Sequence, residues 1–178
     1  DSLNDFLEPG CTVVHLAYLQ GSGEAENLSA AANLVKACTV VGVKRLIHCS
    51  TAAVVGQTKA HTVSEATPCM PTSNYGVTKL KIEQAILAAQ SESLDVVILR
   101  PTAVFGEGGG SLKKLLSDLI SGKNIRNYLK SSLFGDRRMN LVYVENVVAA
   151  IGFMSSFQKN FGGGVYIISQ DEDPLNNF

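Results

Sequence analysis

Short apolar runs rich in β-branched residues recur along this chain of 178 residues. Three of them, at 11–17, 43–50 and 94–100, are bounded by turn-forming or polar residues and predict buried strands. Two later runs, at 141–144 and 163–169, have the same character and predict two further short strands.

Longer segments with apolar residues at helical spacing separate these runs, and they lie at 24–41, 74–90, 111–121 and 144–156. Gly42 is a good stop for the first predicted helix, and Ser73 or Asn74 is a plausible cap for the second. Strands that alternate with helices of this length predict an α/β fold with a mainly parallel sheet. Such sheets bind ligands beyond the carboxyl ends of their strands.

The regular alternation continues to about residue 121 and then breaks. We therefore expect residues 1–121 to form the sheet-bearing domain, and 122–178 to supply a small substrate-side lobe together with the last elements of that domain. The glycine-rich stretch at 106–110 predicts a loop.

Composition limits the classes of function. A net charge of −1, with 46% hydrophobic and 17% charged residues, describes a soluble globular chain without the basic surplus that attracts nucleic acid. The apolar runs are far shorter than the roughly 20 residues of a membrane span. We expect neither nucleic acid nor membrane as a partner.

The four cysteines and three histidines show no metal-ligand spacing, so no metal site is expected. Cys11, Cys38 and Cys49 lie in or beside apolar segments, which favours reduced, buried thiols and a cytoplasmic location. His15 and His48 lie inside strand-like runs and are expected to be core residues with satisfied polar atoms.

Tyr75 and Lys79 are the most informative pair of side chains. They are four residues apart on a predicted helix, so the phenol and the ammonium project from one face. A nearby cation favours phenolate and is expected to lower the pKa of Tyr75 toward a value useful for proton transfer. Thr51, at the end of a predicted strand, can hold the oxygen of an alcohol or ketone, so the three residues suggest hydride transfer at a carbinol carbon.

Six motifs follow one another in a familiar order: VVHLAY, NLSAAANLVKAC, GVKRLIHCSTAAVVG, PTSNYGVTK, LRPTAVFGEG and LVYVENVVAAI. Together they resemble the extended short-chain dehydrogenase/reductases, in the NAD-dependent epimerase/dehydratase branch. The resemblance runs through nearly the whole chain. It implies a Rossmann-like, doubly wound sheet and NAD as cofactor, with NADP possible.

The resemblance also implies roles. Tyr75 would be the general acid/base, Lys79 would lower its pKa and bond the nicotinamide ribose, Thr51 would bond the reacting oxygen, and Asn27 would serve the proton relay. The expected cofactor contacts are Leu16, Ala17, Tyr18, Thr51, Tyr75, Lys79, Pro101 and Thr102, and the expected substrate contacts are Thr51, Tyr75, Ala103, Arg137 and Arg138.

The chain departs from the family pattern in ways that matter. It contains no glycine-rich strand-to-helix loop for a pyrophosphate, and its start resembles a point about 60 residues into the family's domain, so we expect a partial domain. Ala52 and Ala53 stand where 4,6-dehydratases carry Asp-Glu, which argues against dehydratase activity. Met139 stands where many nucleotide-sugar members place an arginine; the adjoining Arg137 and Arg138 are alternatives.

Several functions stay open. A nucleotide-sugar epimerase is preferred, ahead of an NAD(P)H-dependent reductase or an enzyme like 3β-hydroxysteroid dehydrogenase. A non-catalytic dinucleotide-binding regulatory protein is the rival from another class, although such proteins typically lose the tyrosine or the lysine. The resemblance further implies a homodimer packed through the helices at 24–41 and 74–90.

Overall fold

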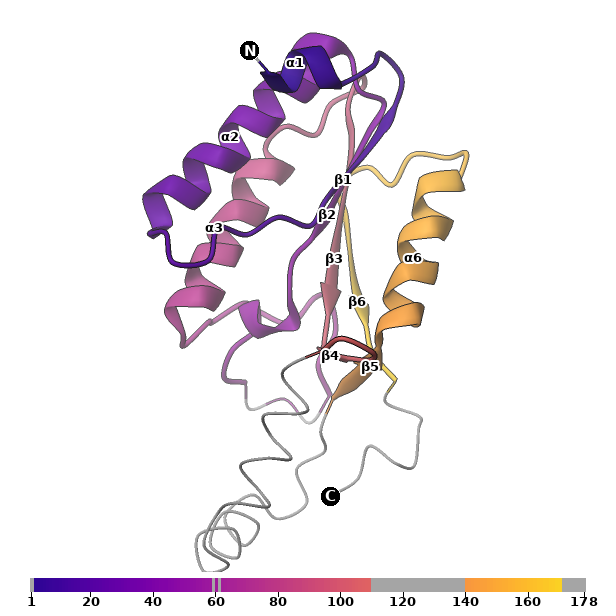
Figure 1. Ribbon diagram of the computed structural model, residues 1–178. Helices are drawn as coiled ribbons and strands as arrows, with labels where there is room; N and C mark the ends of the chain where they lie inside the picture. The colour runs from indigo at the N-terminus through magenta and orange to yellow at the C-terminus, as the bar shows by residue number, and fades with distance from the viewer. Residues whose placement is uncertain (1, 59, 61, 110–139, 171–178) are drawn as a thin grey trace, which may run out of the picture.

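The computed structural model describes residues 2–58, 60, 62–109 and 140–170. Its main sheet has four parallel strands in the order β1-β2-β3-β6 (Figure 1), which are Thr12–His15, Arg45–Cys49, Asp95–Pro101 and Gly164–Ile168. The four corresponding sequence predictions are confirmed to within two residues at each end. β3 includes Pro101 rather than ending before it.

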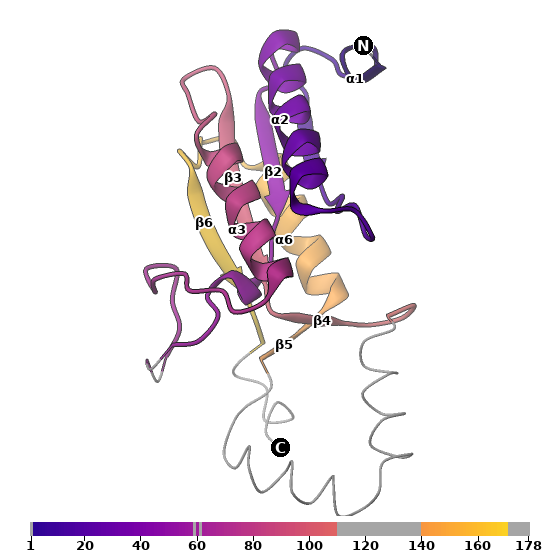
Figure 2. The same cartoon turned by 90° about the vertical axis from the view of Figure 1, so that its left-hand side faces the viewer.

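Helices cover both faces of the sheet. α2 (Glu24–Val41) and α3 (Asn74–Leu87) lie side by side on one face, and α6 (Val144–Ser156) lies on the other, as Figures 1 and 2 show together. A short helix, α1 (Ser2–Phe6), packs near α2. The predicted bounds of α2 and α6 are confirmed, whereas α3 ends three residues earlier than predicted. The fold is α/β and Rossmann-like, as predicted.

Both faces of the sheet are buried, because alternate residues of β2 and β3 belong to two separate hydrophobic clusters. The cluster under α2 and α3 includes Leu46, Val96 and Ile98, and the cluster under α6 includes Ile47, Val97, Leu99 and Met154. Strands with apolar residues on both faces read as continuous hydrophobic runs, which is why periodicity of two was not visible in the sequence.

Three small elements were not predicted, and α1 is the first of them. A 3₁₀ turn, η1 (Ala52–Val54), follows β2, and β4 (Ala103–Phe105) follows β3. β4 pairs in parallel with β5 (Leu141–Tyr143) in a separate two-stranded sheet near the carboxyl ends of the main strands (Figure 2). The strand predicted at 141–144 therefore exists but does not belong to the main sheet.

The predicted helix at 111–121 and the side chains of Arg137 and Arg138 lie outside the described residues. The division of the chain near residue 121 stays a prediction for the same reason. In the described part of the chain, no helix combines the length and the apolar character that crossing a bilayer requires.

Candidate active site

Local capping interactions place the candidate site at the carboxyl end of β2. Thr51 follows β2 and caps η1, and its Oγ1 accepts a hydrogen bond from the backbone N–H of Ala53 at 3.2 Å. Ser73 caps α3, its Oγ accepting from the N–H of Gly76 at 3.1 Å. This cap fixes the first turn of α3, which carries Tyr75. The prediction of Ser73 as a cap is confirmed.

Tyr75 lies at the surface end of the site. Its side chain is 44% exposed, and its ring meets the edge of the Tyr18 ring at a centroid distance of 5.1 Å. Both tyrosines border a hollow of about 310 Å³, whose other lining residues are Ser22, Gly23, Glu24, Asn74, Val77 and Thr78. The hollow therefore gives a small molecule access to the phenol.

The pKa of Tyr75 is raised above its ordinary value, chiefly because partial burial disfavours the phenolate. Cys49 and Tyr18 add to this effect, and a hydrogen bond with the side chain of Thr51 opposes it. The sequence prediction that Lys79 lowers this pKa is wrong for this structure, because the ammonium of Lys79 is directed elsewhere.

Lys79 is almost fully buried, with 2% of its surface exposed. Its Nζ donates to the carbonyl oxygen of Cys49 at 2.8 Å and lies 3.5 Å from Nε2 of His48. Burial lowers the pKa of Lys79, while the Cys49 and Glu83 side chains raise it by a smaller amount. Among the described residues, no carboxylate lies at ion-pair distance from this ammonium.

Asn27 is buried, and its side chain braces the loop after β1. Its Oδ1 accepts from the N–H of Leu19 at 3.0 Å, and its Nδ2 donates to the carbonyl oxygens of Leu19 at 3.2 Å and Gly23 at 3.0 Å. These bonds hold the loop that carries Tyr18. A role of Asn27 in a proton relay stays a prediction.

The remaining predicted cofactor residues lie along the same edge of the sheet. Leu16 is 61% exposed and Ala17 is also exposed, both in the segment that follows β1. Thr102, after β3, directs its Oγ1 to the carbonyl oxygen of Ile168 and to Oγ of Ser169, each at 3.3 Å. Pro101 is buried and Ala103 is exposed. The structure thus brings Tyr18, Thr51, Tyr75 and Lys79 together, with Pro101, Thr102 and Ala103 at the end of a neighbouring strand.

Sequence reasoning missed two polar contacts made by side chains of α3, the helix that carries Lys79. Glu83, one turn after Lys79, forms a buried ion pair with Arg100 of β3, in which Nη2 and Oε2 are 2.7 Å apart. His48 is buried and its ring nitrogens have polar partners, as predicted for a core residue. Its Nε2 also lies beside the ammonium of Lys79, which was not predicted. The spacing of Lys79 and Glu83 on one helix face indicates a pair between these two residues, since residues four apart share a face, and gives no signal for Arg100 as the partner.

The prediction of reduced, buried thiols is confirmed for Cys38, whereas Cys11 and Cys49 are only partly buried. All four cysteines are free thiols; Cys38 is buried, which raises the pKa of its thiol to about 11, and Cys11 and Cys49 are half-buried. Within the described residues, no group of three or more His, Cys, Asp and Glu side chains is arranged to hold a metal ion.

Comparison with known proteins decides the family. The sequence profile of the NAD dependent epimerase/dehydratase family matches residues 1–169. The chain belongs to this family, within the extended short-chain dehydrogenase/reductases. The predicted resemblance is confirmed.

Two curated relatives of the chain have names that describe different activities. The chain is 33% identical over 129 residues to 3beta-hydroxysteroid-dehydrogenase/decarboxylase isoform 1 of Arabidopsis thaliana, covering 70% of this chain and 29% of that protein. It is 29% identical over 165 residues to an uncharacterized UDP-glucose epimerase, YtcB, of Bacillus subtilis, covering 84% of this chain and 50% of that protein. The chain therefore spans half or less of these relatives.

A solved structure of the same fold is that of MoeE5 in complex with UDP-glucuronic acid and NAD. The chain matches it with a TM-score of 0.73 and 27% identity, over 96% of this chain and 62% of that one. Family membership and this structure support NAD as the dinucleotide that the family uses.

Proposed function

We propose that the protein carrying this chain moves a hydride between NAD and the carbon of a secondary alcohol or ketone. One observation carries the proposal: the Tyr75 phenol, whose pKa the side chain of Thr51 lowers, stands at the edge of an open hollow with the buried Lys79 one turn further along the same helix. A hydroxyl, a phenol and an ammonium in this arrangement can hold and move a proton at an oxygen atom.

Each side chain has a distinct role in the proposal. Thr51 hydrogen-bonds the reacting oxygen, and Tyr75 exchanges a proton with it. The raised pKa of Tyr75 keeps the phenol protonated near neutrality, which suits proton donation to a carbonyl oxygen. In the oxidising direction Tyr75 must accept the proton instead.

The residues present fit the ribose end of a nicotinamide dinucleotide. The Lys79 ammonium has three N–H donors, and its contacts with Cys49 and His48 account for two of them. Ser50, directly before Thr51, has a buried Oγ that is without a hydrogen-bond partner in the described part of the chain. NAD, when bound, supplies the hydride acceptor. NADP is the alternative cofactor, because no residue discussed above reads the adenosine ribose.

A nucleotide sugar is the preferred substrate, and epimerisation the preferred reaction. The support is the relative called a UDP-glucose epimerase and the structure of MoeE5 with a UDP-sugar. Ala52 and Ala53 offer no acid or base beside Thr51, which argues against water elimination. Arg137 and Arg138 would bind the diphosphate of such a substrate.

An NAD(P)-dependent reductase or hydroxysteroid-type dehydrogenase is the second candidate. The observation that favours it is the 33% identity to the hydroxysteroid dehydrogenase/decarboxylase of Arabidopsis. The two candidates differ in outcome, since an epimerase returns hydride and proton to the substrate whereas a dehydrogenase consumes its cofactor. A non-catalytic dinucleotide-binding role is the third candidate, and the presence of both Tyr75 and Lys79 argues against it.

The test uses the full-length protein that carries this chain, incubated with NAD and either a UDP-hexose or a 3β-hydroxysteroid. Inversion of the sugar carbon, read by proton NMR without net formation of NADH, supports the epimerase. Steroid-dependent NADH formation supports the dehydrogenase. NAD binding without turnover of either substrate overturns the enzymatic proposal in both forms.

Matched variants tie the activity to the site. Tyr75→Phe and Lys79→Met are expected to lower kcat by roughly 10²–10⁴-fold, the usual contribution of acid–base groups. Tyr166→Phe on β6 and Lys44→Met, an exposed lysine directly before β2, remove the same atoms elsewhere and are expected to leave kcat unchanged. Equal losses in all four variants would show that the effect is not specific to the site.

A cytoplasmic location and a homodimer through α2 and α3 also belong to this proposal. The dimer is supported by exposed apolar surface on α2, where Val40 is 65% exposed. A monomeric mass of the full-length protein in light scattering would refute it.

A further inference from the structure

His48 connects the lysine-bearing helix to the edge strand of the sheet. It lies on β2 directly opposite His15 of β1 in the parallel register, and it is fully buried. Its Nδ1 is 2.9 Å from Nδ1 of His15, the two rings stack at a centroid distance of 4.9 Å, and its Nε2 is 3.5 Å from Nζ of Lys79. The three side chains form one continuous line from β1 to α3.

The chemistry of the groups fixes the direction of these contacts. An ammonium has only donors, so Nε2 of His48 must be the acceptor in its contact with Lys79. The ring proton of His48 is then on Nδ1, where it points toward His15. Nδ1 of His15 in turn accepts, which leaves the His15 proton on Nε2.

The charges around His48 favour its neutral form. Lys79 acts on His48 from α3 and His15 from β1, whereas Glu83 and the Cys49 thiol act on Lys79, whose Nζ lies 6.0 Å from the centre of the Tyr18 ring. Burial, then the Lys79 charge and then His15 lower the pKa of His48 well below its usual range, and a hydrogen bond to the backbone of His15 opposes them. A neutral imidazole can accept from the ammonium at any pH near neutrality.

We infer that His48 is a positioning residue for Lys79: its Nε2 accepts a hydrogen bond from the ammonium, and His15 fixes the tautomer in which it can do so. The inference depends on the proposed function at one point, because that function gives Lys79 a part in the reaction. The carbonyl of Cys49 and the ring of His48 together hold the buried cation in place, and in the described part of the chain no carboxylate lies at ion-pair distance from it.

The native full-length protein gives the first test. Long-range ¹⁵N–¹H spectra report which ring nitrogen of a histidine carries the proton. The expected result is a neutral His48 protonated on Nδ1 from about pH 6 to about pH 8. A His48 protonated on Nε2, or charged in this range, cannot accept from Lys79 and overturns the inference.

Two variants of His48 distinguish the loss of a hydrogen-bond acceptor for Lys79 from a change in side-chain packing. In His48→Gln the side-chain oxygen can reach the place of Nε2, whereas in His48→Asn the amide reaches only the place of Nδ1. The readout is the pKa of Lys79, followed through its ¹³Cε resonance. Loss of the acceptor destabilises the ammonium, so we expect this pKa to fall by about one unit in His48→Asn and to stay near the native value in His48→Gln.

Turnover gives an independent readout. His48→Asn is expected to lower kcat about ten-fold with little change in KM, and His48→Gln to restore most of the loss. Equal Lys79 pKa values in the two variants overturn the inference even if turnover is normal. A Lys79 pKa that responds as expected in a protein without hydride transfer refutes the proposed function and leaves the inference intact. If the variants do not fold, the tautomer of native His48 decides.

Discussion

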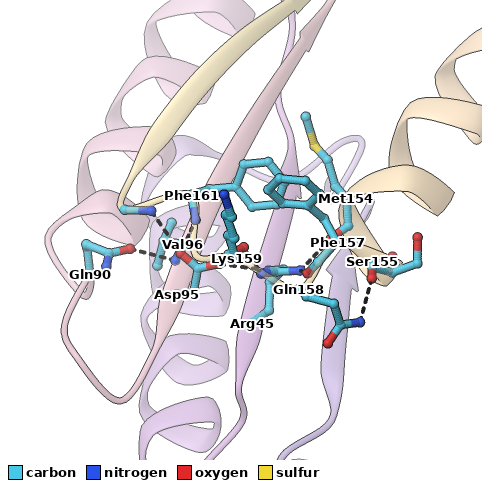
Figure 3. A network of polar contacts seen from close by, with 12 residues as sticks. Arg45, Gln90, Asp95, Val96, Met154, Ser155, Phe157, Gln158, Lys159 and Phe161 are labelled. Carbon is cyan, nitrogen blue, oxygen red and sulfur yellow. Dashed lines mark hydrogen bonds and ion pairs between the residues drawn. The ribbon is translucent and has the colours of Figure 1, made fainter.

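Arg45 and Asp95 form a buried ion pair on the face of the sheet opposite the candidate active site. Nε of Arg45 lies 2.7 Å from Oδ2 of Asp95, and the two side chains are 1% and 2% exposed. Arg45 also donates to the carbonyl oxygen of Met154 in the last turn of α6 and to those of Phe157 and Lys159, which follow the helix (Figure 3). Asp95 Oδ1 accepts from the backbone N–H groups of Phe161 and Gly162. The pair therefore joins β2 and β3 to the turn between α6 and β6.

Removing one member of this pair should cost far more than removing a surface pair. Asp95→Ala leaves the Arg45 guanidinium buried without its carboxylate, and we expect a loss of about 3–5 kcal/mol in the free energy of unfolding. Glu24→Ala breaks the exposed pair with Lys81, which is 2.6 Å long, and is expected to cost at most about 1 kcal/mol. Urea denaturation of both variants measures the difference. Similar losses would mean that the buried pair contributes no more than the exposed one.

Local elements of this fold were predictable because their signals are local. The apolar spacing of α2, its Gly42 stop and the Ser73 cap each depend on neighbours within a few residues. The Tyr75 and Lys79 pair was predictable for the same reason, since both residues lie on one helix.

Polar partners distant in the sequence were not predictable. Arg45 and Asp95 are 50 residues apart, and nothing in the composition of either strand selects the other as partner. Likewise, Lys79 was expected to act on Tyr75, but its ammonium contacts the carbonyl of Cys49 and the ring of His48. β4 escaped prediction because it lies between Pro101, which predicts the end of the preceding strand, and the glycine-rich stretch at 106–110, which predicts a loop.

The Ser73 cap should link stability to activity. Ser73→Ala removes the acceptor for the N–H of Gly76 and is expected to cost about 1 kcal/mol of unfolding free energy. The first turn of α3 also carries Tyr75, so fraying there should lower kcat while Ser73→Asp, which keeps a cap, preserves it. Denaturation and turnover of the two variants provide the measurement. Unchanged turnover in Ser73→Ala would show that the rest of α3 holds Tyr75 without the cap.

Two glycines should respond to alanine in opposite directions. Gly56, just after η1, has a φ of +65°, and an added Cβ would collide with the backbone of Met70 and Pro71. Gly56→Ala is therefore expected to destabilise the protein by more than about 1 kcal/mol. Gly152 lies within α6 with no atom near an added Cβ, so Gly152→Ala should stabilise by up to about 1 kcal/mol. Thermal melting distinguishes the two, and a stabilised Gly56→Ala would contradict the close approach.

Acid should destabilise the fold through His48. The folded pKa of His48 lies well below 6.5, chiefly through burial, whereas in the unfolded chain it is close to that value. Between these two pKa values the unfolded state binds more protons, so stability falls as the pH drops below about 6.5, by up to about 1.4 kcal/mol per pH unit. The pKa of His15 is lowered in the same sense, and its half-exposed ring adds a smaller contribution of the same sign.

His48→Gln isolates this contribution, because glutamine does not titrate. Unfolding free energies from about pH 7.5 to about pH 5.5 should fall less steeply in the variant than in the native protein, and the two curves should run parallel above about pH 7. Parallel curves over the whole range would mean that the folded protein accommodates a charged His48. That result would also remove the neutral acceptor on which the positioning of Lys79 depends.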